Sequence, residues 1–268
     1  MFRVVHRHAA WTGPIGGELA YRWLRRAYPT RNTTASRMDG SAYRNRSKIE
    51  TLLGAGIFEK LEGKTVLDFG CGMGTEVIEL AERGARHVFG LDINPWALRG
   101  ARENVARSSV ADRITITDDP STVPPIDFII SLDSFEHFWN PGQVLEHMAA
   151  LLPPGGRVLT AFGPTWYHPL GGHVFSPFNW AHLVFDEATL CRWRNSTRAT
   201  DHTMSYRETG GGPSLMSIRR FVQAVDVSPL EAVRIEAVPI RKLAWLHNRL
   251  TREFTTAIVR AELSKPEA

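Results

Sequence analysis

The chain has 268 residues, of which 43% are hydrophobic and 22% are charged, as in ordinary globular proteins, so a disordered or collagen-like chain is excluded. No apolar stretch approaches the roughly 18 uncharged residues that a membrane span requires. Two cysteines, Cys71 and Cys191, are too few for a disulfide framework and fit a reducing compartment. Basic residues stand where a secretion signal would have its apolar core, so we expect a cytoplasmic protein without a signal peptide.

The formal net charge is +4, and the positive charge is concentrated before residue 65, where the chain has 12 Arg and Lys residues but only five Asp and Glu residues. Such a segment is compatible with an anionic substrate, a membrane surface or nucleic acid, but a solvated face on a terminal helical segment is the favoured explanation. No nucleic-acid-binding motif accompanies the charge, so we do not expect a nucleic-acid partner. Peripheral membrane contact through this segment is retained as an expectation, and the sequence gives no oligomeric state.

From residue 64 onward, short apolar runs alternate with amphipathic segments. The pattern predicts helices over 75–83, 94–107 and 140–152, and Asn94-Pro95 and Asn140-Pro141 mark the starts of the last two. Strands are predicted at 65–69, 87–92, 113–117, 126–132 and 157–162. This alternation indicates an α/β protein with a doubly wound, mostly parallel sheet.

Residues 163–213 interrupt the alternation, because they are rich in Trp, His, Phe, Gly and Pro and too long for an ordinary connection. We therefore predict an insertion after the fifth strand. After it, the pattern predicts a helix over 214–225, a strand over 231–238, a helix over 241–253 and a last strand over 254–263, which brings the sheet to seven strands.

A glycine-rich turn, Gly70-Cys71-Gly72-Met73-Gly74, follows the first predicted strand. Glycines at such a turn permit unusual backbone angles and let a ligand approach the main chain, and ligands of open α/β sheets bind at the carboxyl ends of the strands. The dinucleotide fingerprint G-x-G-x-x-G would need glycine where Thr75 stands. Asp92, which ends the second strand, is placed to accept hydrogen bonds from ribose hydroxyls, but it does not by itself distinguish nucleotide classes.

Four segments, 66–74, 90–93, 127–137 and 151–156, resemble in order and spacing the class I S-adenosylmethionine-dependent methyltransferases. The resemblance is to the type 11 subgroup, which includes the ubiquinone/menaquinone methyltransferases and many sugar and natural-product enzymes. It implies a Rossmann-like methyltransferase fold over 64–268, closed by an antiparallel strand. We expect residues 1–63 to form a helical lid over the cofactor. The resemblance also implies S-adenosyl-L-methionine as cofactor, S-adenosyl-L-homocysteine as product, and the ribose as the ligand of Asp92.

The resemblance also assigns roles to the residues of the glycine-rich turn. Gly70, Cys71 and Gly72 would lie against the methionine part of the cofactor, with Gly74 completing the turn. Asp68, at the end of the first strand, would organise it.

Further cofactor contacts are implied at the ends of the next strands. Ile93 would pack on the adenine, and either Asp118 or Asp119 would accept its amino group. Leu132 and Asp133, which end the fourth strand, would approach the methionine ammonium.

Methyl transfer from a sulfonium is an in-line displacement in which the cofactor brings the leaving group, so the protein needs to align the acceptor and take its proton. His173, just after the fifth strand, is a candidate base or acceptor contact, or else it organises its loop through hydrogen bonds. His137, after the fourth strand, is the second candidate, with a structural role as its alternative. His168, His173 and His182 lack carboxylate or cysteine neighbours at metal-ligand spacing, so we expect no metal.

The insertion carries an aromatic set that would either line an acceptor pocket or form a small core of its own; its members are Trp166, Tyr167, Phe175, Phe178, Trp180, Phe185 and Trp193. The favoured hypothesis is a methyltransferase that acts on oxygen of a small-molecule, sugar or lipid-linked acceptor. Two alternatives remain: a non-catalytic S-adenosylmethionine-binding protein of the same fold, and a nicotinamide-dependent oxidoreductase.

Overall fold

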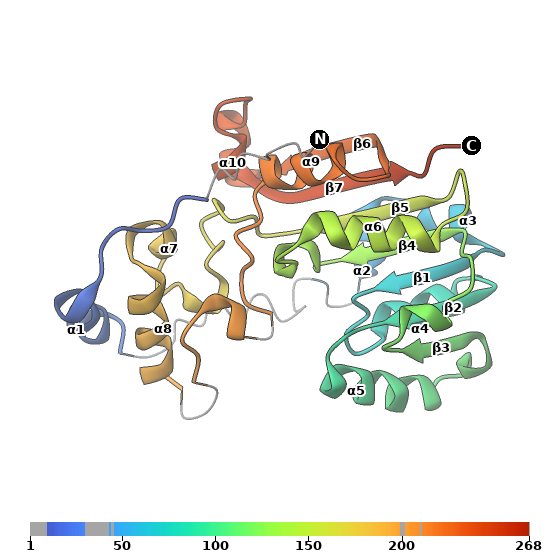
Figure 1. Cartoon of the computed structure of the whole chain (residues 1–268), viewed down its shortest axis with the longest axis horizontal. Helices are drawn as coiled ribbons and strands as arrows, with labels where there is room; N and C mark the ends of the chain where they lie inside the picture. The colour runs from blue at the N-terminus through green and yellow to red at the C-terminus, as the bar shows by residue number, and fades with distance from the viewer. Residues whose placement is uncertain (1–9, 30–42, 44–45, 199–201, 210, 268) are drawn as a thin grey trace, which may run out of the picture.

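The computed structural model describes residues 10–29, 43, 46–198, 202–209 and 211–267. Within these residues, seven strands form one sheet in the order β3-β2-β1-β4-β5-β7-β6 (Figure 1). The strands are β1 (Thr65–Phe69), β2 (His87–Leu91), β3 (Ile114–Thr117), β4 (Phe128–Leu132), β5 (Arg157–Phe162), β6 (Glu231–Pro239) and β7 (Thr256–Ser264). β1 to β5 pair in parallel, and β7 is antiparallel to both of its neighbours. The predicted doubly wound, mostly parallel sheet is confirmed.

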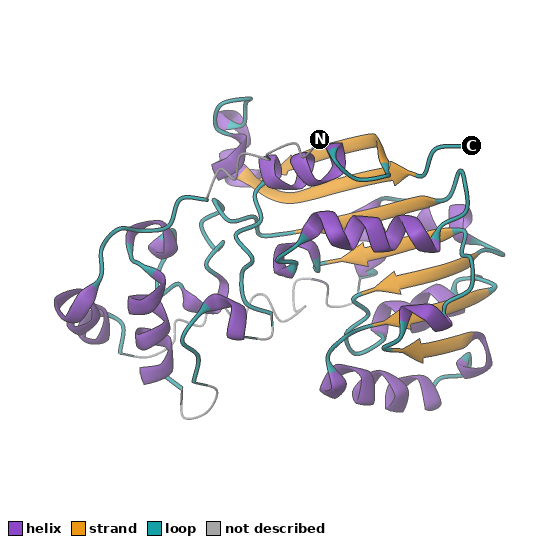
Figure 2. Cartoon of the chain, in the orientation of Figure 1, coloured by secondary structure: helices purple, strands orange, loops and turns teal. Residues whose placement is uncertain are grey.

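Helices cover both faces of this sheet (Figure 2), which explains why the central strands are continuously apolar. On one face pack α6 (Pro141–Leu151) and α9 (Ile218–Asp226). The opposite face carries α2 (Lys48–Leu53), α3 (Ile57–Leu61) and α4 (Thr75–Glu82).

At the β3 end of the sheet, α5 (Pro95–Ala106) lies beside α4 (Figure 1). Asn94 caps α5 as predicted, because its side-chain oxygen accepts hydrogen bonds from the N–H groups of Trp96 and Ala97. None of the helices in the described residues has the length and hydrophobicity needed to cross a bilayer.

The insertion after β5 forms a separate helical layer beside the sheet. It contains α7 (Ala181–Val184) and α8 (Glu187–Ser196), and α1 (Gly17–Ala27) packs against α8 (Figure 1). Its core includes the buried aromatic side chains Trp166, Phe175, Phe185 and Trp193, joined by Leu24 of α1. The aromatic set therefore builds mainly its own core, as one of the two alternatives proposed.

The helix predicted over 241–253 is wrong in its extent. The segment instead forms the 3-10 helix η8 (Arg241–Leu246) and the short α10 (Arg252–Thr255). Asn248 separates them, because its side-chain oxygen accepts a hydrogen bond from the N–H of Leu250 at 2.9 Å and its amide donates to the carbonyl of Leu246 at 3.1 Å. These local bonds compete with those of a continuous helix.

Candidate functional site

The glycine-rich turn lies at the carboxyl ends of β1 and β2, and its three glycines adopt the left-handed conformation that favours this residue. Their φ angles are 90° at Gly70, 51° at Gly72 and 78° at Gly74. A Cβ on Gly70 would lie 2.5 Å from Ser134 Oγ. The N–H groups of Gly70 and Cys71 both donate to the carbonyl of Leu91, at 2.8 and 3.1 Å, so the turn is fixed to the end of β2.

Asp92 joins this turn to the loop that follows β2. One carboxylate oxygen accepts from the N–H of Gly72 at 2.9 Å, and the other accepts from the N–H of Asn94 at 2.8 Å. Because each carboxylate oxygen can accept two hydrogen bonds, a ligand can still bind to both. The neighbouring Ile93 is 91% exposed, so its apolar side chain is free to cover a flat ligand.

Asp68 is buried at the end of β1, directly before the turn. Burial raises the pKa of its carboxyl to about 8, with further increases from the charges of Glu76 and Asp92, while Lys48 acts in the opposite direction. The residue that we predicted to organise the turn therefore lies within a cluster of acidic groups.

Lys48, on α2, was not predicted to belong to the site. Its ammonium lies 3.0 Å from Asp133 Oδ2 and 3.3 Å from Glu76 Oε1, in side chains that are less than a third exposed. Burial opposes its charge, but the attraction of Asp133 and Glu76 outweighs burial and raises the pKa of Lys48. Tyr43 lies close by, and burial together with Asp133 raises the pKa of its phenol to about 12.

Glu136 is a second residue without a predicted role. Its side chain is buried, and its Oε2 has no hydrogen-bond partner within the described part of the chain. Burial and the charge of Asp133 raise the pKa of Glu136 well above its ordinary value. Glu136 belongs to the segment 127–137 that carries the family resemblance and stands directly before His137, and this position was the signal that could have revealed it.

His137 and His173, the two predicted catalytic residues, lie together beyond the ends of β4 and β5. Their ring centroids are 5.2 Å apart. The Nδ1 of His137 donates to the carbonyl of Gly212 at 3.0 Å, which leaves its Nε2 without the proton in the neutral ring. Burial lowers the pKa of both imidazoles, so each ring is held in its neutral form, in which one of its two nitrogens carries no proton.

His168 and His182 have structural roles in the insertion. His182 donates from Nε2 to the carbonyl of Trp166 at 2.6 Å and lies 3.1 Å from Ser176 Oγ through Nδ1. His168 Nδ1 accepts from the N–H of Leu170 at 2.9 Å. Burial lowers the pKa of each to about 4. Across the described residues, no three His, Cys, Asp or Glu side chains are grouped as metal ligands.

The remaining predicted cofactor residues lie at the same edge of the sheet. Asp118 and Asp119 follow β3 and are both exposed. Asp119 caps the 3-10 helix η4 (Pro120–Thr122) by accepting from the N–H of Ser121 at 2.9 Å, and this hydrogen bonding lowers the pKa of its carboxyl. Leu132 is buried at the end of β4.

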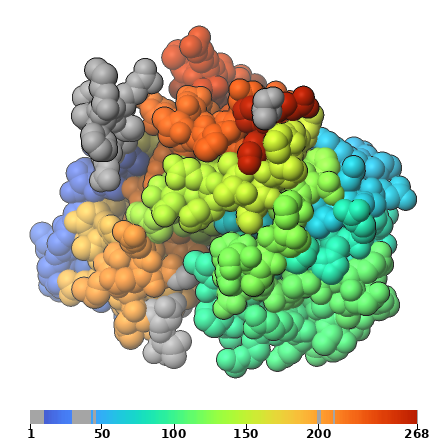
Figure 3. Space-filling view, turned by 45° about the vertical axis from the view of Figure 1, so that its right-hand side comes forward, coloured from blue at the N-terminus to red at the C-terminus, as the bar shows by residue number. Residues whose placement is uncertain are grey.

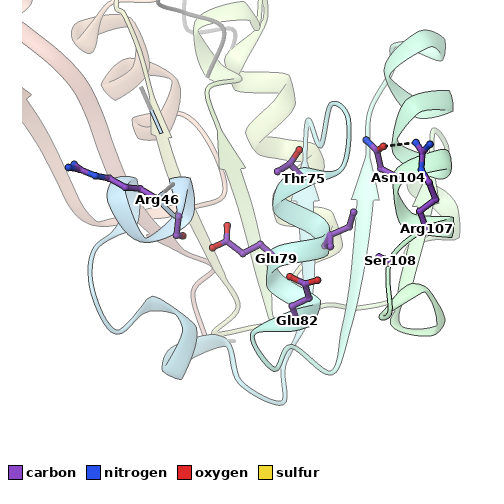
Figure 4. Close-up of a pocket in the computed structure, with 9 residues that line it drawn as sticks. Arg46, Thr75, Glu79, Glu82, Asn104, Arg107 and Ser108 are labelled. Carbon is purple, nitrogen blue, oxygen red and sulfur yellow. Dashed lines mark hydrogen bonds between the residues drawn. The ribbon is translucent and has the colours of Figure 1, made fainter. Parts of the chain in front are cut away.

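An open groove of about 640 Å³ lies on the outer side of α4, next to the turn (Figure 4). Thr75 and Glu79 of α4 line it together with Asn104 of α5 and Arg107. Arg107 donates to Asn104 Oδ1 at 3.0 Å, and Arg46 directs its guanidinium away from both helices. This groove contains none of the residues predicted for the site.

Comparison with known proteins identifies the family and the fold. Residues 37–225 match a family described as "methyltransferase domain", and this match covers more than half of the chain. The chain belongs to this methyltransferase family. The predicted resemblance is thereby confirmed, and the sheet order and the glycine-rich turn are features of a class I methyltransferase domain.

Curated relatives of the family include ribosomal protein L11 methyltransferases. The match to that of Photorhabdus laumondii has 46% identity over 103 residues, which is 38% of this chain and 34% of the relative. That of Enterobacter sp. has 33% identity over 105 residues, again 38% of this chain and 34% of the relative. The chain thus spans about a third of the length of the curated relatives it matches.

Solved structures share the fold at low sequence identity. An S-adenosylmethionine-dependent methyltransferase from Methanosarcina mazei superposes with a TM-score of 0.51 and 16% identity, covering 79% of this chain and 98% of the other. The [4+2]-cyclase SpnF gives a TM-score of 0.51 at 13% identity over 79% of this chain and 80% of its own. At these identities the likeness shows the fold alone.

Proposed function

We propose that the chain binds S-adenosyl-L-methionine at the glycine-rich turn and transfers its methyl group to oxygen of a small-molecule, sugar or lipid-linked acceptor. The turn supports the first part. Gly70 and Gly72 leave the main chain bare at positive φ, the lone pairs of Asp92 suit a ribose diol, and exposed Ile93 suits an adenine face. These features fit the cofactor that the family implies.

The acidic groups next to the turn suit the charge of the methionine part. Asp133 already pairs with an ammonium, that of Lys48, at 3.0 Å. In our proposal, the ligand ammonium shares or replaces this partner, beside buried Leu132. Either Asp118 or Asp119 accepts the adenine amino group in this proposal, because Asp119 keeps free lone pairs after it accepts from Ser121 at the cap of η4.

The cofactor supplies the activated methyl group and its own leaving group. His173 and His137 carry the protein's part of the reaction in this proposal. Buried, neutral imidazoles whose rings are 5.2 Å apart can orient an acceptor hydroxyl and accept its proton as the new bond forms. This histidine pair is the single observation that supports oxygen as the methylated atom.

A transfer assay tests the proposal. Purified protein is incubated with methyl-labelled S-adenosylmethionine and separate pools of free sugars, hydroxylated lipids and ribosomal protein L11. We expect label in a hydroxylated acceptor, and loss of that label in His173→Ala but not in His168→Ala, since His168 only closes a turn. Label in ribosomal protein L11 alone would contradict a small-molecule, sugar or lipid-linked acceptor, and would support a second candidate function, methylation of a ribosomal protein, which rests on the curated relatives.

Two further outcomes would overturn the proposal. Tight cofactor binding without transfer to any acceptor would indicate a non-catalytic binding protein of this fold. Binding of NADH in place of S-adenosylmethionine would restore the nicotinamide alternative that Thr75 argues against.

A further inference from the structure

A protrusion lies between the last two strands, where residues 240–255 form η8 and α10; we call it the β6–β7 protrusion (Figures 1 and 3). β6 ends and β7 begins at the carboxyl edge of the parallel strands, since Phe162 at the end of β5 is paired with Val259 of β7. The protrusion is therefore at the same edge of the sheet as the glycine-rich turn and the histidine pair.

The surface of the protrusion is unusually apolar for exposed residues. Trp245 is 80% exposed and Leu250 is 90% exposed, and Leu246 and Phe254 are exposed beside them. Large apolar side chains gathered on an exposed surface indicate a site of interaction.

Local hydrogen bonds fix the backbone that presents these side chains. Asn248 bonds to the backbone of Leu246 and Leu250, and His247 Nδ1 lies 2.9 Å from Thr255 Oγ1. The protrusion therefore holds Trp245 and Leu250 outward in a defined arrangement rather than in an irregular loop.

Charge distinguishes this surface from an ordinary apolar patch. Its charged residues are four basic ones, Arg241, Lys242, Arg249 and Arg252, and one acidic one, Glu253. The carboxylate of Glu253 binds the start of α9, where it accepts from the N–H groups of Arg219 and Ile218 at 2.9 and 3.1 Å. The protrusion thus combines exposed apolar side chains with unbalanced positive charge.

We propose that the β6–β7 protrusion inserts into the surface of a bilayer that contains anionic phospholipid. Trp and Leu favour the boundary between headgroups and acyl chains, and Arg and Lys around them attract lipid phosphates and anionic headgroups. A convex protrusion cannot enclose a peptide, whereas it can enter a soft lipid surface. This contact would turn the carboxyl edge of the sheet toward the membrane, where the lipid-linked acceptor of the proposed function would lie.

The exposed aromatic surface continues toward the start of the described chain. The ring of Phe254 lies 5.3 Å from that of Tyr167, whose hydroxyl accepts from the N–H of Trp11 at 3.2 Å. Trp11 is itself 58% exposed. The proposed contact is centred on residues 240–255 and does not rest on the basic residues before residue 65, and it does not depend on methyl transfer.

Vesicle sedimentation of the full chain tests this proposal. We expect binding to vesicles of equimolar phosphatidylcholine and phosphatidylglycerol and little binding to pure phosphatidylcholine. Arg241→Glu combined with Arg249→Glu should weaken binding about tenfold or more. Arg99→Glu combined with Arg102→Glu changes the net charge equally on α5, at the other end of the sheet, and should retain binding.

The apolar part is tested by Trp245→Ser combined with Leu250→Ser, against Trp96→Ser as a control at another exposed tryptophan. The double variant should lose vesicle binding and keep its melting temperature, because both side chains are already in solvent. Failure of the wild-type chain to bind anionic vesicles would overturn the proposal, as would equal losses in the two charge-reversal pairs. A wild-type dimer that this double variant dissociates would show instead that the surface binds a second copy.

Discussion

Replacement of Asp92 by alanine tests the cofactor site at its best-defined residue. The carboxylate accepts from the N–H groups of Gly72 and Asn94 at 2.9 and 2.8 Å, which leaves one lone pair on each oxygen. In the proposal, these two lone pairs accept hydrogen bonds from the two ribose hydroxyls. A hydrogen bond to a charged group contributes about 1.5 kcal/mol or more. Because about 1.4 kcal/mol corresponds to a tenfold change, Asp92→Ala should raise the Kd of S-adenosylhomocysteine about a hundredfold.

Calorimetric titration measures this change, and Asn94→Ala is the matched control. Asn94 stands two residues away and caps α5 through bonds to Trp96 and Ala97. Its loss should cost about 1 kcal/mol of stability with little change in Kd. An unchanged Kd in Asp92→Ala, or an equal rise in Asn94→Ala, would refute the reasoning, and melting curves of both variants separate loss of ligand bonds from loss of fold.

Three other predictions concern the histidine pair, the buried glutamate and the turn. His173→Ala should lower kcat by about 10²–10⁴-fold. Because burial lowers the pKa of His173, the acid limb of the wild-type kcat–pH profile should lie below 6.5, the ordinary pKa of histidine. An acid limb at 6.5 would exclude a buried histidine as the base. The raised pKa of Glu136 means that the folded chain binds a proton that the unfolded chain has lost, so stability falls as pH rises above the ordinary value of 4.5. The melting temperature of Glu136→Gln should therefore exceed that of the wild type more at about pH 8 than at about pH 5, and equal differences would contradict the raised pKa. Gly70→Ala should destabilise the fold by about 1–3 kcal/mol and weaken ligand binding. Gly142→Ala is the control and should do neither, because a Cβ there meets nothing within 4 Å. Equal free energies of unfolding in urea for the two variants would show that the turn tolerates a side chain.

The parallel sheet could be predicted because its strands are buried on both faces and separated by helices of ordinary length. The turn could be predicted because glycine is the residue favoured at positive φ angles such as those of Gly70, Gly72 and Gly74. The histidines were each placed near a strand end from sequence. Their approach to 5.2 Å depends on how the insertion folds back, which no local pattern records.

Other parts of the site depend on contacts between distant segments. Lys48 was one of many basic residues in its segment, and its ion pair with Asp133 exists because α2 packs against the face that carries α4. Glu136 was visible in a motif but had no assigned role, since its burial follows from tertiary packing. The helix predicted over 241–253 failed because the side chain of Asn248 binds the local backbone more effectively than a helical pattern suggests. The lid role of residues 1–63 stays a prediction, and residues 1–9, 30–42 and 44–45 of this segment lie outside the described part of the chain.

Direct binding measurement tests the central claim, that the glycine-rich turn holds S-adenosylmethionine. Calorimetric titration of the purified chain compares S-adenosylmethionine, S-adenosylhomocysteine and NADH under one set of conditions. The account predicts saturable binding of both sulfur ligands, with a Kd on the order of micromolar, and no binding of NADH. Binding of NADH with neither sulfur ligand would contradict it.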